Sequence, residues 1–96
     1  MHAFHLGIDV AKAKLDCALR LPDGKFFHKV VENKQTAFTQ LLTFLGKHHA
    51  QGVHVCMEAT GIYWEAIAEF LAAREGFTVS VMNPAQIQAF AASRLT

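Results

Sequence analysis

Apolar and polar residues alternate along the first third of the chain, and this pattern predicts three consecutive β-strands. Residues 3–10 are mostly apolar, and every second position between residues 15 and 21 is apolar, which is the period of a half-buried strand. Pro22-Asp23-Gly24 combines a fixed φ, a side chain that bonds its own backbone and a residue that tolerates positive φ, so it predicts a tight turn. We expect strands over residues 3–10, 14–21 and 25–32, joined as an antiparallel meander.

Helical and extended patterns alternate along the rest of the chain. After residue 36, apolar residues recur three and four positions apart, which predicts a helix. Asn33 or Thr36 is expected to cap this helix, which should end near residues 47–50. The expected buried stripe of this helix is Phe38, Leu41, Leu42 and Leu45. Short apolar runs predict two more strands, over residues 53–58 and 77–82.

Two further helices are expected between and after these strands. Thr60 is a suitable N-cap for the first of them, and Gly76 suits the position just beyond its C-terminus. Its expected buried stripe is Trp64, Ile67, Phe70 and Leu71. Asn83-Pro84 opens the last helix, because proline is preorganised for a first helical turn.

The element order is therefore β-β-β-α-β-α-β-α, which predicts an α/β protein with a mixed five-stranded sheet and helices on both faces. This is the order of the RNase H-like (RuvC-like) fold. We expect residues 1–96 to form one domain that is truncated at the C-terminus, since the last helix has no stop signal before Thr96.

Composition limits the classes of protein to which the chain can belong. A hydrophobic content of 52% with 18% charged residues is typical of a folded globular domain. Nine Lys and Arg against eight Asp and Glu give a net charge of +1, which excludes a basic nucleic-acid-binding arm. The two cysteines have no metal-ligand spacing, and no apolar run reaches the roughly 20 residues of a membrane helix. We expect a cytoplasmic protein with reduced thiols and no membrane partner.

Two carboxylates end apolar strands, and they are the first candidates for chemistry. Asp9 lies among Leu6, Ile8 and Val10 in a strand expected to be buried, where an unpaired carboxylate costs several kcal/mol. Glu58 ends the strand 53–58. If the two strands are parallel neighbours, both side chains meet at one end of the sheet, and oxygen ligands of this kind suit Mg²⁺ or Mn²⁺. The structural alternatives are a strand-end aspartate that bonds nearby amides and a glutamate that interacts with a helix dipole.

Other residues are candidates for contacts with nucleic acid. Lys12 and Lys14 lie near Asp9 and could contact phosphates, although solvated lysines are the default. Thr60 begins a helix whose amides could meet a phosphate. Tyr63 could stack on a base, whereas Asp16 is expected to be a solvated residue.

Three motifs in order resemble DEDD-type insertion-sequence transposases of the IS-one-ten group. The first is GIDVAK at residues 7–12, followed by Leu15-Asp16. The second is MEATGIYW at residues 57–64, and the third is VMNPAQ at residues 81–86, followed by FAAS at residues 90–93. Together they cover essentially the whole chain.

The resemblance implies a RuvC-like domain in which four acidic residues, Asp-Glu-Asp-Asp, bind divalent metal and act on DNA strands. By position, Asp9 is the first and Glu58 the second, and the other two would follow Thr96. It also implies transposon ends and target DNA as partners, a structured guide RNA in some members, a homo-oligomer, and a bacterial nucleoid-associated location. A chain with half of the carboxylates is expected to be inactive alone.

Three alternatives remain open at this point. Actin-like nucleotide-binding domains also open with a glycine, an apolar residue and an aspartate, but their next turn is rich in glycine and hydroxyl residues, and residues 10–14 are VAKAK. A non-catalytic dimerisation or nucleic-acid-binding module on the same fold is a second reading. A Holliday-junction resolvase is the third, and residues 58–64 favour the transposase over it.

Overall fold

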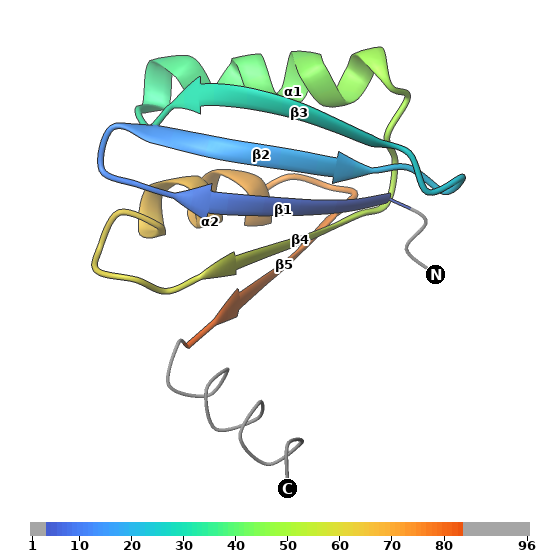
Figure 1. Cartoon of the computed structure of the whole chain (residues 1–96). Coiled ribbons are helices and arrows are strands. Elements are labelled where there is room, and N and C mark those ends of the chain that lie inside the picture. The colour runs from blue at the N-terminus through green and yellow to red at the C-terminus, as the bar shows by residue number, and fades with distance from the viewer. Residues whose placement is uncertain (1–3, 84–96) are drawn as a thin grey trace, which may run out of the picture.

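The computed structural model describes residues 4–83, which form one five-stranded sheet with two α-helices (Figure 1). In chain order the elements are β1 (Phe4–Val10), β2 (Lys14–Arg20), β3 (Phe26–Glu32), the 3-10 turn η1 (Gln35–Ala37), α1 (Phe38–Lys47), β4 (Val53–Glu58), α2 (Glu65–Ala72) and β5 (Phe77–Met82). The predicted strands are confirmed to within one residue at each described end.

The sheet is mixed, and β1 lies at its centre. The strand order is β3-β2-β1-β4-β5. The meander β1-β2-β3 is antiparallel, whereas β4 and β5 join parallel to β1. Parallel neighbours require crossover connections, and α1 and α2 provide them. The carboxyl ends of β1, β4 and β5 consequently lie at the same end of the sheet.

Strand alternation gives the sheet one apolar face, and both described helices pack on it. The buried strand residues are Leu6, Ile8, Leu15, Cys17, Leu19, Val31, Val53, Val55 and Met57. From α1 and α2 the same core receives Phe38, Leu41, Phe44, Leu45, Ile67, Ala68 and Leu71. The Phe38 and Phe70 rings, one from each helix, have centroids 5.3 Å apart, so the helices are neighbours on one face.

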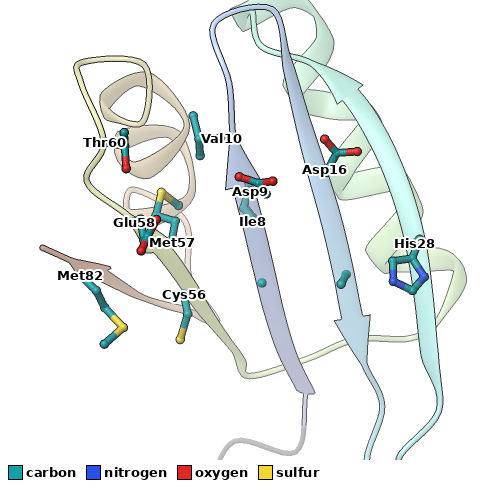
Figure 2. Close-up of a pocket in the computed structure, with 12 residues that line it drawn as sticks. Ile8, Asp9, Val10, Asp16, His28, Cys56, Met57, Glu58, Thr60 and Met82 are labelled. Atoms are coloured by element: carbon teal, nitrogen blue, oxygen red, sulfur yellow. The ribbon is translucent and has the colours of Figure 1, made fainter. Parts of the chain in front are cut away.

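No described helix covers the opposite face, which we call the open face. It carries Asp9, Asp16, His28, Cys56 and Glu58, among others (Figure 2). The helix expected after Asn83, which would have to provide the second helical layer, lies outside the described residues. Of the helices in residues 4–83, none combines the length and the apolar character that a membrane crossing needs.

The predicted start of the first helix is wrong. A 3-10 turn precedes α1, and neither Asn33 nor Thr36 caps it, because Ala37 occupies the N-cap position without a side-chain hydrogen bond. The Asn33 side chain instead donates to carbonyls of two distant loops. The predicted stripe is right for Phe38, Leu41 and Leu45. Leu42 is half-buried against the core, and Phe44 is buried in addition.

The predicted limits of the second helix are also wrong. Thr60 is not an N-cap, since residues 61–64 form a turn and α2 begins at Glu65. The turn is closed by the Trp64 indole, whose Nε1 donates to the Gly61 carbonyl at 3.0 Å. Gly76 does not end α2, which stops at Ala72. With φ of +87°, Gly76 instead makes the turn into β5.

Candidate metal centre

Asp9 and Glu58 occupy neighbouring positions at the carboxyl ends of two parallel strands. β1 and β4 pair in register up to Ile8 and Met57, and the two carboxylates belong to the next residue of each strand. Because consecutive residues alternate between the faces of a sheet, both side chains leave the apolar core and lie on the open face (Figure 2). The expected juxtaposition therefore follows from the observed register.

Asp16 is a third carboxylate at the same level of the sheet. It pairs directly with Asp9 across the antiparallel β1-β2 ladder, and directly opposed residues have Cβ atoms about 4.5–5.5 Å apart. Asp16 lies outside the core, as its position in the strand pattern predicts, whereas its pairing with Asp9 was not predicted. The hairpin turns at Lys12 and Ala13, where the Ala11 N–H donates to the Lys14 carbonyl, so that positions 9 and 16 become partners.

The three carboxylates line one cavity of about 540 Å³ (Figure 2). Gly7 pairs with Ala18 on one side and with Cys56 on the other. This row of small residues leaves a hollow beside the row of carboxylates. The remaining lining residues are Ile8, Val10, His28, Met57, Thr60 and Met82. The cavity is wide enough for a ligand larger than a single ion to approach the carboxylates.

The expectation that Asp9 is a buried carboxylate is wrong within the described residues. Asp9 and Glu58 are both exposed, and no charged side chain belongs to the core of residues 4–83. The reason is that β1 is central in the sheet but packs helices on one face alone in this part of the chain. Neither carboxylate forms an ion pair with a described residue, so their charges are not neutralised by a neighbouring lysine or arginine.

This donor set fits part of a divalent metal site. Adjacent carboxylates repel each other unless a cation lies between them, and oxygen-only ligation suits Mg²⁺ or Mn²⁺. Within residues 4–83, however, no three His, Cys, Asp or Glu side chains are arranged to hold an ion by themselves. Asp9 and Glu58 can therefore supply two ligands, and the rest of a coordination shell must come from water, substrate or residues outside this range.

Of the three candidate nucleic-acid contacts, Thr60 lines the cavity and the two lysines lie near it. However, four residues separate Thr60 from the start of α2 at Glu65, so the helix N-terminus does not reinforce a phosphate contact there. Lys12 is exposed in the β1-β2 turn. Lys14 is 59% exposed, and its Nζ lies 3.8 Å from Asp16 Oδ2. Both lysines stand at the same end of the sheet as the carboxylates without lining the cavity.

Sequence comparison identifies relatives over almost the whole chain. The model of the DEDD-type IS110 family, described as a transposase, matches residues 6–96. Pilin gene-inverting proteins of Moraxella lacunata and Moraxella bovis are each 33% identical to the chain over an alignment of 95 residues that covers 97% of the chain. The chain spans 29% of the length of these curated relatives.

Structural comparison supports the fold. The T. thermophilus RuvC structure, solved in complex with a Holliday junction substrate, superposes with a TM-score of 0.59 at 15% sequence identity, covering 92% of this chain and 69% of RuvC. The predicted RNase H-like (RuvC-like) fold with a mixed five-stranded sheet is thereby confirmed. Together with the family match over residues 6–96, this shows that the chain belongs to the DEDD-type IS110 (IS-one-ten) transposase family.

Proposed function

We propose that this chain contributes Asp9 and Glu58 to a Mg²⁺ or Mn²⁺ site that cleaves and transfers DNA strands during transposition. The observation that carries the proposal is the register of β1 and β4, which brings both carboxylates to one level of the open face. When bound, divalent ions would stabilise the attacking and leaving oxygens of a phosphodiester. Asp9 and Glu58 would hold such ions against the sheet.

The described residues support a site that is shared with other parts of the protein. Residues 4–83 have no complete ligand set, and the family resemblance implies two further aspartates beyond Thr96. We infer that the chain is inactive alone. The cavity in front of the carboxylates, about 540 Å³ in volume, would admit the sugar-phosphate backbone of a DNA strand.

Partners and location follow from the same proposal. DNA, as transposon ends and target, is the partner that a phosphodiester-cleaving site requires, and Lys12, Lys14 and Thr60 are its proposed contacts on this chain. A structured guide RNA, a homo-oligomer and a bacterial nucleoid-associated location are carried over from the family resemblance. We do not retain the actin-like nucleotide-binding alternative, because the transposase family model matches residues 6–96.

A second candidate function has one observation in its favour. Because no three ligands converge in residues 4–83, the chain could serve as a nucleic-acid-binding or dimerisation module without chemistry of its own. The two functions predict different responses to divalent metal, which a titration separates.

The test is a calorimetric titration with Mn²⁺ on this chain and on a longer chain that includes the two following aspartates. We expect binding to tighten in the longer chain and to disappear with Asp9→Ala. Asp23→Ala is the matched control, because Asp23 is an exposed aspartate in the β2-β3 turn whose neighbour is Lys25. Folded proteins that bind no Mn²⁺ at either length would reject the metal site and favour the non-catalytic module.

A further inference from the structure

The Asn33 carboxamide joins the two segments that follow the carboxylate strands. Its Nδ2 donates to the Ala11 carbonyl at 2.8 Å and to the Tyr63 carbonyl at 3.0 Å. Ala11 lies two residues after Asp9, and Tyr63 lies five residues after Glu58. The backbone N–H of Asn33 also donates to the Ala13 carbonyl at 3.0 Å. One residue thus bonds the β1-β2 turn and the β4-α2 loop at the same time.

This bridge lies beyond the point where the sheet itself holds the two strands together. The β1-β4 ladder ends at Ile8 and Met57, one residue before Asp9 and Glu58. Past that point Asp9 still pairs with β2 and Glu58 with β5, but the direct pairing of β1 with β4 does not continue. The Asn33 bridge restores a connection between the two strands, because it joins the segments that follow them on the far side of the carboxylates.

The chemistry of asparagine suits this role. Its amide nitrogen has two N–H donors on a short side chain, and both are directed to backbone carbonyls here. The β4-α2 loop is also fastened at its start, where the Ala59 N–H donates to the Met82 carbonyl at 2.8 Å. The loop after Glu58 is therefore hydrogen-bonded at both ends, to β5 at its start and to Asn33 at its end.

We propose that Asn33 is a positioning residue of the metal site, which fixes the segments after Asp9 and Glu58 and thereby sets the separation of their carboxylates. This inference rests on the proposed function. Outer residues that orient metal ligands typically change metal affinity by about 10- to 100-fold when they are removed. Asn33→Ala should therefore weaken Mn²⁺ binding without contacting the ion.

The first measurement is amide hydrogen exchange in the metal-free protein. The Ala11 N–H bonds to the Lys14 carbonyl and the Glu65 N–H to the Ile62 carbonyl, so each reports the opening of one bridged segment. We expect both to exchange about tenfold faster in Asn33→Ala, in line with the loss of a bridging hydrogen bond. The Gly24 N–H, bonded to the Leu21 carbonyl in the distant hairpin, should not change. Unchanged exchange at Glu65 would overturn the proposal.

The second measurement is the Mn²⁺ dissociation constant of the full-length protein. We expect it to rise about 10- to 100-fold in Asn33→Ala and to stay the same in Gln40→Ala, which truncates an exposed amide on α1. Faster exchange with unchanged Mn²⁺ affinity would show a purely structural role and overturn the proposal. If the unaltered protein binds no Mn²⁺, the proposed function fails together with this role, while the exchange data still report the bridge.

A second variant keeps the test decisive if Asn33→Ala does not fold. Asn33→Ser retains one donor and can satisfy one of the two carbonyls. We expect its Mn²⁺ dissociation constant to lie above that of the unaltered protein, by less than about 100-fold. An affinity equal to that of the unaltered protein would show that two donors are not needed, and would overturn the proposal.

Discussion

The two cysteines illustrate how the faces of the sheet give one residue type different properties. Cys17 of β2 points into the core and is 2% exposed. Burial, and secondarily the negative charge of Asp16, raises the pKa of the Cys17 thiol from 9.0 to about 12. Cys56 of β4 is half-buried on the open face, with its Sγ 3.9 Å from His54 Nε2. A thiol reagent at neutral pH should therefore modify Cys56 before Cys17.

The raised pKa of Cys17 predicts a dependence of stability on alkaline pH. The folded protein holds this proton more tightly than the unfolded chain, so the contribution of Cys17 is complete below pH 9 and is lost as pH rises from 9 toward about 12. We expect the free energy of unfolding, from urea titrations at several pH values, to fall less steeply across this range in Cys17→Ala. Parallel pH profiles for the two proteins would contradict the prediction.

At the scale of elements, α1 and α2 stabilise the sheet through one shared core. Phe38 is completely buried at the start of α1 and contacts Phe70 of α2. On the edge strand β3, by contrast, Phe26 is 57% exposed on the open face. The same residue type is thus a core residue in one element and a surface residue in another.

This contrast predicts very different effects of removing each ring. Phe38→Ala should lower the free energy of unfolding by about 3–5 kcal/mol, because it removes buried surface and leaves a cavity. Phe26→Ala, the matched control, should change it by no more than about 0.5 kcal/mol. Urea unfolding followed by circular dichroism measures both. A small effect of Phe38→Ala would mean that the core can close around the missing ring.

At the scale of the molecule, the positions of the charged side chains are more informative than the net charge. The net charge is +1, yet exposed Lys12 and Lys14 stand at the same end of the sheet as Asp9 and Glu58. In the proposed function, Lys12 and Lys14 would contact the phosphates that flank a scissile bond, while Asp9 and Glu58 would face the bond itself. With so small a net charge, the chain would contribute modestly to DNA affinity.

The lysines give a prediction for the salt dependence of DNA binding. Lys12→Gln together with Lys14→Gln should weaken binding of the full-length protein to a labelled DNA duplex and reduce the slope of log affinity against log salt by about 2, since each phosphate contact contributes roughly 0.9. Lys25→Gln, in the hairpin at the other end of the sheet, is the control and should leave both the DNA affinity and the salt slope nearly unchanged. Fluorescence anisotropy at several salt concentrations measures the slope. Equal slopes for all three proteins would exclude these lysines as phosphate contacts.

The sequence by itself determined the strands, the element order as far as β5 and two members of the candidate site. Strand periodicity is a local property, so the alternation of residues 14–21 and the apolar run of residues 53–58 were sufficient. Asp9 and Glu58 were recognisable because each is an acidic residue at the end of an apolar strand. The helix limits were less predictable, because Thr36 and Thr60 are good caps in isolation, whereas the turns before α1 and α2 are set by contacts with other segments.

The tertiary structure decided what those local patterns cannot specify. The pairing of β1 with both β2 and β4 placed Asp16 beside Asp9, and the packing of both described helices on one face left Asp9 and Glu58 exposed. The Asn33 side chain found its hydrogen-bond partners in carbonyls 22 and 30 residues away in the chain. Contacts at such separations depend on how strands are arranged in the sheet, and the hydrophobic period of a single segment carries no information about that arrangement.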